Sequence, residues 1–193
     1  MYETAADIDR RIAERLKAER EALGLTLEQL AERSLVSRAM ISRIERRQSS
    51  PTAALLGRLC GGLEITLSSL LAGIDGAASE VLRAGDQPTW RDPKTGLRRR
   101  AMSPSGRGSP VEIIHGTLPP RARIDYPPMS GPIADQHIVG LEGTVQFGGG
   151  DVAHDVGPGD CLHCALDRPH FFANPGTEPC VYLVVLVKRR GEQ

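Results

Sequence analysis

The chain has 193 residues, of which 40% are hydrophobic and 25% are charged, as in an ordinary globular protein of one large or two modest domains. Its 24 basic and 24 acidic side chains cancel, so total charge alone does not indicate a nucleic-acid partner. No apolar run approaches the length of a membrane span, and residues 1–20 are charged throughout. We therefore expect neither a transmembrane helix nor a signal peptide, no membrane partner, and a cytoplasmic protein whose four cysteines are reduced.

The first part of the chain shows the spacing of short amphipathic helices. Between residues 7 and 23 an apolar stripe repeats at helical spacing, at Ile8, Ile12, Leu16 and Leu23. Thr26 is an N-cap residue with Gln29 three positions later, as in a capping box, so a second helix is expected to begin there. Residues 34–36 then form a connection of helix-turn-helix size.

Residues 37–47 predict a third helix with two different faces. At about 100° per residue, one face carries the apolar side chains Met40, Ile41 and Ile44. The opposite face carries small and basic side chains: Arg38, Ala39, Ser42, Arg43 and Arg46. Ser37 is a good N-cap, at the helix end that carries a positive partial charge. These features are typical of a DNA recognition helix, and the alternative is an ordinary amphipathic helix with solvated arginines.

Two further helices are expected after this one. Residues 48–52 contain Ser, Pro and Thr, which end one helix and allow another to begin. Apolar side chains then recur at helical spacing, at Leu55, Leu56, Leu59 and Leu63. A last short helix near residues 66–71 would complete a bundle of five.

This arrangement resembles the five-helix domain of XRE-type, phage-repressor-like regulators. The resemblance covers residues 7–73 and is carried by Leu-Thr-Leu-Glu-Gln-Leu-Ala at 25–31, Ile-Ser-Arg-Ile-Glu at 41–45 and Ser-Pro-Thr at 50–52. It implies double-stranded operator DNA as a partner. By the same resemblance the base contacts would be Arg38, Ala39, Ser42 and Arg43, and the phosphate contacts Thr26, Ser37, Arg46, Arg47 and Gln48.

Two other positions of this domain carry expectations from the resemblance. The family usually has glycine after the recognition helix, where this chain has Arg47, whose charge could reach a phosphate. The family also pairs an arginine of the first helix with the glutamate of the recognition helix, here Arg20 with Glu45. The alternative for that pair is two exposed charges that contribute little to stability.

Composition changes at residues 72–79, where helical periodicity ends and small residues gather. We therefore predict a helical domain at residues 1–73, a linker at 74–80 and a second domain at 81–193. In the second domain, short apolar runs separated by Gly and Pro predict an all-β sandwich or barrel. These runs are residues 111–118, 137–141, 144–147, 161–164 and 181–187.

A turn at residues 89–96 carries the only tryptophan and precedes a run of three arginines, Arg98, Arg99 and Arg100. Such a run could reach DNA or an anionic ligand. We instead expect an exposed strand at a sheet edge, kept soluble by its charge.

Residues 140–145 and 157–174 resemble the two halves of a cupin motif, which implies a barrel of the double-stranded β-helix type. Gly159, His170 and Asn174 match the second half. Anchored on Gly143, the first half places Gln136 where the family has a metal-binding glutamate, and no histidine pair aligns. Because three of the four usual ligands are missing, we expect no metal, no cofactor and no catalytic residue.

The same resemblance favours a pocket that recognises a small polar effector by hydrogen bonds. Its candidate residues are Gln136, His137, His170 and Asn174. Simple alternation along the strand places His137, Val139 and Leu141 on one face, whereas the motif alignment points Gln136 inward, and the sequence leaves both possibilities open.

The pair Cys161 and Cys164 has a spacing common among zinc ligands. On a strand, however, these two positions face opposite sides. We therefore expect buried thiols that act as small apolar groups. His115 and His154 are expected to be structural or solvated.

The sequence thus predicts a multidomain α plus all-β protein, with a five-helix helix-turn-helix bundle followed by a cupin-like β-barrel. Its predicted function is effector-controlled, sequence-specific DNA binding by a non-enzymatic transcriptional regulator. We expect a homodimer formed by the barrel, with the apolar strand at 181–187 in the interface. Two alternatives are a cupin metalloenzyme, an oxygenase or isomerase, fused to a helix-turn-helix domain, and a degenerate cupin that serves only as a dimerisation module.

Overall fold

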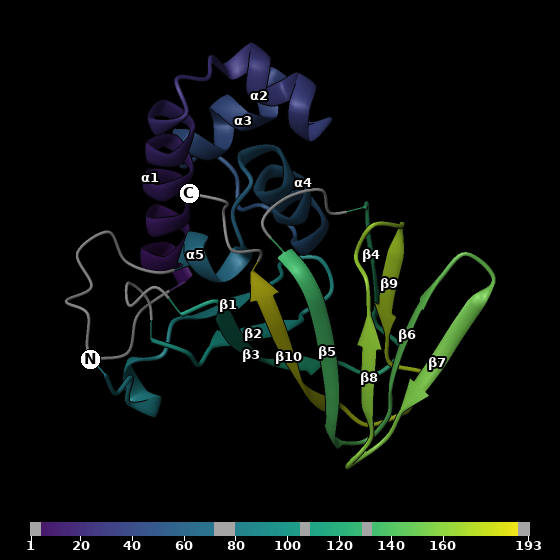
Figure 1. Cartoon of the computed structure of the whole chain (residues 1–193). Coiled ribbons are helices and arrows are strands. Elements are labelled where there is room, and N and C mark those ends of the chain that lie inside the picture. Colours follow the sequence, from purple (N-terminus) through teal and green to yellow (C-terminus); the bar gives the residue numbers. More distant parts are fainter. Residues whose placement is uncertain (1–4, 72–79, 105–108, 129–132, 189–193) are drawn as a thin grey trace.

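The computed structural model describes residues 5–71, 80–104, 109–128 and 133–188, and consists of a helical part packed on a β-sheet part (Figure 1). The linker predicted at 74–80 lies outside the described residues except for its last position. The helices are α1 (Ala5–Ala22), α2 (Leu27–Ser34), α3 (Arg38–Glu45), α4 (Ala53–Leu63) and α5 (Leu67–Leu71), followed by a 3-10 turn, η1 (Ala84–Asp86). No helix in these ranges is long and apolar enough to span a membrane.

Polar N-caps fix where the short helices begin. Thr26 accepts a hydrogen bond from the backbone N–H of Gln29, and the Gln29 side chain accepts one from the N–H of Thr26, which completes the predicted capping box. Ser37 caps α3 and Thr52 caps α4 in the same way. The apolar faces predicted for the helices pack together in one buried cluster, which includes Ile12, Leu16, Leu30, Ile41, Ile44, Leu56, Leu59 and Leu63. Leu23, by contrast, is 47% exposed because α1 ends one residue before it.

The β part is formed by two antiparallel sheets that face each other. One sheet has the strand order β1-β2-β3-β10-β5-β8 and the other β4-β9-β6-β7. The strands are β1 (Thr89–Arg91), β2 (Arg98–Ala101), β3 (Val111–Leu118), β4 (Arg123–Tyr126), β5 (Ile133–Glu142), β6 (Val145–Gly149), β7 (Val152–Val156), β8 (Cys161–Cys164), β9 (His170–Ala173) and β10 (Cys180–Lys188). This is the predicted cupin-like barrel, and β3 and β8 have the predicted bounds.

Strand β2 differs from its prediction as an exposed edge. It lies between β1 and β3, so β1 forms the edge of the sheet instead. Arg98 is exposed and Arg100 is half-buried on one face, whereas Arg99 is buried on the other. The buried guanidinium donates a hydrogen bond to the hydroxyl of Tyr126 over 3.2 Å and lies 5.6 Å from the centre of that ring. The prediction was wrong because β1, which covers the edge of β2, has only three residues. So short a strand shows too little alternation to be predicted from sequence.

Helix α4 packs against β4 of the barrel, and α5 lies beside the six-stranded sheet (Figure 1). The buried carboxylate of Glu112 on β3 joins the two parts, because it accepts a hydrogen bond from Thr66 over 2.8 Å and another from Ser69. Lys188 at the end of β10 pairs with the same carboxylate. The two parts therefore share one continuous core rather than being connected only through a linker.

Gly57 and Gly61 on α4 provide a matched test of this packing. A methyl group at Gly57 would come within 2.9 Å of the Tyr126 ring, whereas a methyl group at Gly61 would meet nothing within 4 Å. Gly61→Ala should stabilise the protein by about 0.5–1 kcal/mol through helix propensity. Gly57→Ala should be less stable than Gly61→Ala by about 1–3 kcal/mol because it overpacks the junction. Urea unfolding monitored by circular dichroism measures both, and equal stabilities would contradict the described junction.

Candidate nucleic-acid interface and barrel pocket

Helix α3 presents one face to the helical core and the other to solvent. Ile41 and Ile44 are buried and Met40 is half-buried. Three of the predicted base contacts, Arg38, Ala39 and Arg43, are exposed, and the fourth, Ser42, is half-buried. The structure therefore brings the four candidate residues together on the accessible side of one helix.

A bidentate ion pair fixes the orientation of α3. Nε of Arg20 on α1 lies 2.7 Å from Oε1 of Glu45, and its Nη2 lies 3.0 Å from Oε2. A third donor of Arg20 bonds the carbonyl of Leu25 over 2.8 Å. The side chains of the pair are only 11% and 9% exposed, and the bond to Glu45 raises the pKa of Arg20. The pair is thus a partly buried, geometrically matched contact rather than two solvated charges.

The chain leaves α3 through a left-handed residue at the position where a glycine is usual. Arg47 has φ = +61°, and the N–H of Gln48 bonds the carbonyl of Arg43 over 2.8 Å, as in a Schellman motif. The guanidinium of Arg47 also forms an exposed ion pair with Glu14 of α1 over 2.5 Å. Arg47 therefore tethers the exit turn to α1 while remaining at the surface.

The other predicted phosphate contacts lie around the same face. Thr26 and Ser37 are exposed N-caps at the starts of α2 and α3, whose N-terminal N–H groups favour anions. Arg46 is exposed, and its guanidinium bonds the hydroxyl of Ser42 over 2.6 Å. Gln48 is exposed in the exit turn. These residues surround the base-contact candidates on both sides.

The barrel holds a separate cavity of about 320 Å³. His170 on β9 lines it, and so do Leu162, His163 and Cys164 on β8. The remaining lining comes from strands β6 and β7 and from the loop before β9, and includes Phe147, Gly148, Gly149, Val152, His154, Ala165, Asp167, Arg168 and Pro169. Of these lining residues, only His170 was predicted from the sequence as a pocket residue. The others come from separate strands and are brought together by strand pairing.

His170 is the most strongly constrained polar residue of this cavity. Its Nδ1 lies 3.0 Å from the carbonyl of Arg168, and a carbonyl can only accept, so Nδ1 carries the hydrogen. Nε2 of the neutral ring is then a hydrogen-bond acceptor. The ring is stacked on Tyr126 at 5.5 Å and packed against Phe147 at 5.6 Å. This burial lowers the pKa of His170, which keeps the ring neutral at neutral pH.

The structure shows which of Gln136 and His137 on strand β5 points into the barrel. Gln136 is buried and faces the barrel interior, where its amide bonds the sulfur of Cys164 over 3.3 Å. His137 lies on the outer face, where its ring is 4.9 Å from that of His163. The motif alignment therefore predicted the inward residue, and His137 does not belong to the barrel pocket.

Asn174 is also placed differently from its prediction as a pocket residue. It is 3% exposed, and its amide donates to the carbonyls of Leu118 and Glu178 over 3.0 and 2.8 Å. Its side-chain oxygen accepts from the N–H of Gly176. Because all three bonds join it to backbone groups, Asn174 holds the loop after β9 rather than lining the cavity.

Cys161 and Cys164 lie on opposite faces of β8, as strand geometry predicted. Cys164 is half-buried and Cys161 is exposed, so the expectation of two buried thiols is wrong. Within the described ranges, no group of three or more His, Cys, Asp or Glu side chains is arranged to hold a metal ion.

Two known protein families match the chain along its length. A helix-turn-helix family matches residues 16–70, and the cupin domain family matches residues 117–186. The chain is an XRE-type helix-turn-helix protein with a C-terminal cupin domain. In this helix-turn-helix cupin protein, the helix-turn-helix domain and the cupin domain meet at the junction formed by α4, α5 and the barrel.

Individual proteins are similar to all or part of the chain. An HTH_3 family transcriptional regulator from Vibrio cholerae is 27% identical, with a TM-score of 0.80 over 97% of this chain and 100% of the other. The HTH-type transcriptional regulator SutR from Escherichia coli (strain K12) is 39% identical over 66 residues, 34% of this chain. That match spans only 37% of SutR. Hydroxypropylphosphonic acid epoxidase from S. wedmorenis is 18% identical, with a TM-score of 0.46 over 95% of this chain and 100% of the other, too weak a likeness for a functional argument.

The lowered pKa of His170 predicts a pH-dependent stability. Because the folded pKa lies below the ordinary value of about 6.5, the unfolded chain takes up the extra proton first as the pH falls. The contribution of neutral His170 to the free energy of unfolding is therefore complete above about pH 6.5 and is lost progressively below it. His170→Asn, whose amide can still donate to Arg168, should lose less unfolding free energy than the parent between about pH 7.5 and pH 5.

Urea unfolding at a series of pH values measures this difference. His154→Asn is the matched control, because His154 lines the same cavity but is exposed. It should keep the pH dependence of the parent protein. An unchanged pH dependence in His170→Asn would show that the ring is not buried in its neutral form.

Proposed function

We propose that this protein is a transcriptional regulator whose helix α3 binds the major groove of double-stranded operator DNA. The observation that carries the proposal is the exposed face of α3, with Arg38, Ala39 and Arg43 on a helix held by Arg20 and Glu45. The side chain of Arg43 makes no hydrogen bond or ion pair with any residue in the described ranges, so its guanidinium is available for a base edge. The regulator names of the Vibrio cholerae and Escherichia coli relatives support the same function.

The surrounding polar groups fit the phosphates of the same groove. Arg46, Arg47 and Gln48 lie at the end of α3, and the capped starts of α2 and α3 offer backbone N–H groups. Phosphate contacts position a protein on DNA, whereas contacts to base edges supply specificity. We therefore assign general affinity to these residues, with Thr26 and Ser37, and specificity to the exposed face of α3.

For the barrel, we propose binding of a small polar effector in the cavity beside His170. The effector would donate a hydrogen bond to Nε2 of His170, because Nδ1 is already bonded to the chain. Gln136 supports the cavity wall through Cys164. The absence of a three-ligand cluster in the described ranges favours recognition over metal-assisted catalysis, so we propose a non-enzymatic barrel.

We also propose a homodimer that buries the apolar part of the outer face of the six-stranded sheet, centred on strand β10. Strand β10 lies at the centre of this sheet, between β3 and β5, so its edges are not available for pairing. Its outward side chains Val181, Leu183, Val185 and Val187 are apolar and only half-buried. Ile113 on β3 and Val139 on β5 extend this apolar patch, whereas His115, Thr117 and His137 on the same strands are polar. A second copy would cover this face and place two recognition helices at half-sites about 34 Å or a multiple apart.

Substitution of the exposed arginines tests the DNA assignment. Selection of binding sites from random DNA would first provide an operator. Arg38→Ala and Arg43→Ala should each lose about 1–3 kcal/mol of base discrimination if the arginine bonds guanine in a bidentate manner. Arg46→Ala should instead weaken binding to all sequences and flatten the salt dependence.

Arg58→Ala is the matched control, because Arg58 is exposed on α4 and has no assigned role in base recognition. It should retain the preference for the selected operator, measured by fluorescence anisotropy at fixed salt. Parent-like affinity and selectivity in both Arg38→Ala and Arg43→Ala would show that α3 is not the recognition helix.

A charge placed at the centre of the apolar sheet face tests the dimer. Val185 lies between Ile113 and His137 in the sheet register. Val185→Lys should sediment as a monomer at micromolar concentration, whereas the parent should sediment as a dimer. Leu23→Lys, at an exposed apolar site beyond α1, should leave the dimer intact. A monomeric parent, or a dimeric Val185→Lys variant, would refute this interface.

A further inference from the structure

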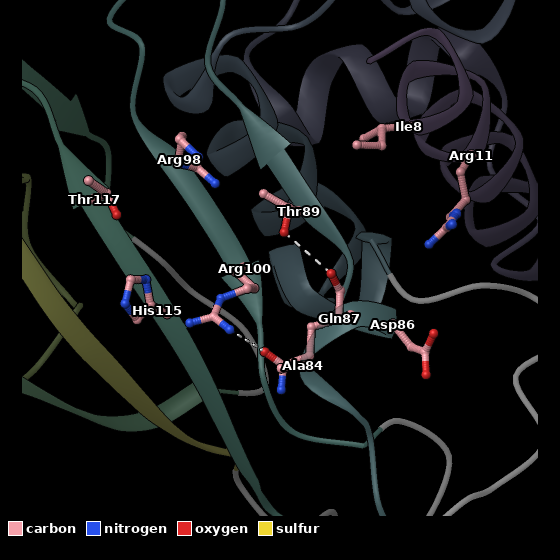
Figure 2. A pocket seen from close by; sticks show the side chains of 11 residues that line it. Ile8, Arg11, Ala84, Asp86, Gln87, Thr89, Arg98, Arg100, His115 and Thr117 are labelled. Carbon is pink, nitrogen blue, oxygen red and sulfur yellow. Dashed lines mark hydrogen bonds between the residues drawn. The ribbon is translucent and has the colours of Figure 1, made fainter. Parts of the chain in front are cut away.

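A second and larger hollow lies where the helical part meets the outer face of the six-stranded sheet (Figure 2). Its volume is about 710 Å³. Helix α1 lines one side and strands β1, β2 and β3 line the other, with η1 at the rim. The lining residues are Ile8, Arg11, Ala84, Gly85, Asp86, Gln87, Thr89, Arg98, Arg100, His115 and Thr117. None of them belongs to the barrel pocket or to the exposed face of α3.

The lining is rich in positive charge. Arg98 and Arg100 project from β2, and Arg11 projects from α1, against the single carboxylate of Asp86. Figure 2 shows Arg100 beside His115 on the neighbouring strand, with Arg11 on the other side of the hollow. Arg98 and Arg100 alone bring two positive charges to this space, against the one negative charge of Asp86, while His115 is neutral.

No carboxylate in the described ranges neutralises the two strand arginines. The side chain of Arg98 makes no hydrogen bond or ion pair within those ranges, and that of Arg100 donates to the amide oxygen of Gln87 over 2.9 Å. Asp86 forms no ion pair with either of them. Arg11 donates to the carbonyl of Leu71 over 3.1 Å, which holds it at the junction.

The strand register keeps these groups together. Arg98 and Arg100 are two residues apart and so share one face of β2, opposite Thr117 and His115 on β3. Like charges this close repel each other, and partial burial at a domain junction weakens the screening by water. Burial and the two arginines lower the pKa of His115, which makes it a neutral donor or acceptor at neutral pH.

We propose that this hollow binds a small multivalent oxyanion, such as a phosphorylated or polycarboxylate metabolite. Arg98 and Arg100 would supply charge-assisted hydrogen bonds, for which a guanidinium suits both phosphate and carboxylate oxygens. His115 and Thr117 would add neutral hydrogen bonds, and Arg11 would bind from the helical side. The volume is within the range of ligand sites for molecules of metabolite size.

This site differs from the barrel pocket in ligand class and in position. The barrel pocket favours a hydrogen-bond donor beside a neutral histidine, whereas the junction site favours an anion between arginines. Because α1 contributes one wall and the sheet the other, a bound anion would contact both parts of the protein at once. Its binding does not depend on the proposed function in DNA recognition.

Isothermal titration calorimetry with inorganic pyrophosphate and with citrate, each at matched ionic strength, tests the proposal. The two probes separate a phosphate preference from a carboxylate preference. We expect one-to-one binding of at least one probe to the parent. Arg98→Gln/Arg100→Gln should weaken that binding at least tenfold, since it removes two charge-assisted contacts.

Two controls separate this site from other basic surfaces. Arg38→Ala/Arg43→Ala removes the charged face of α3, and Arg58→Gln removes an exposed arginine of α4. Both should bind the probe as the parent does. Thermal unfolding without the probe checks that each variant is folded, and Arg11→Gln provides a second variant of the site from the other wall, expected to bind more weakly.

Three outcomes would overturn the proposal. The parent could bind neither probe, Arg98→Gln/Arg100→Gln could bind as tightly as the parent, or binding could be lost in Arg38→Ala/Arg43→Ala. The last result would assign the anion to the DNA-binding face and would leave the proposed function intact.

Discussion

The ion pair between Arg20 and Glu45 is the contact on which the helical part depends most. It joins α1 to α3 with two short bonds, while a third donor of Arg20 holds the carbonyl of Leu25 ahead of α2. One guanidinium thus fixes three helices relative to one another. Removing one member would leave the other charge partly buried and unpaired, which typically costs about 3–5 kcal/mol for a buried pair. Because Glu45 is the last residue of α3, the same contact sets which face of α3 is exposed.

The junction between helices and barrel gives the second constraint. Tyr126 stacks on His170 of the barrel pocket, accepts a hydrogen bond from the buried Arg99 and packs against Gly57 of α4. A ligand that moves His170 would therefore act on a side chain that touches the helical part directly. Any resulting change in DNA affinity is limited to the ligand's preference between two arrangements, typically about 1–3 kcal/mol.

Much of the fold could be predicted from local signals. Thr26, Gln29 and Ser37 are caps whose chemistry acts within a few residues, so the starts of α2 and α3 were predictable. Strand β3 alternates in burial along its whole length and was predicted with its bounds. The cupin-motif alignment pointed Gln136 inward, but simple alternation pointed His137 inward, and only the structure decided between them.

Other features depend on contacts between distant segments. Asn174 bonds the carbonyl of Leu118, 56 residues away, so its structural role is invisible in a motif. Arg99 is buried where its guanidinium bonds the hydroxyl of Tyr126, 27 residues away, and this contact has no local signature. The junction hollow likewise combines α1 with β2 and β3, although the sequence did single out its arginine run.

The central claim is that the exposed face of α3 reads DNA while Arg20 and Glu45 hold the helix. A crystal structure of the protein bound to a selected operator tests this claim most directly. We expect α3 in the major groove, with Arg38 or Arg43 bonded to base edges and the pair of Arg20 and Glu45 intact. A complex in which α3 faces away from the duplex, with DNA held by another surface, would contradict the account.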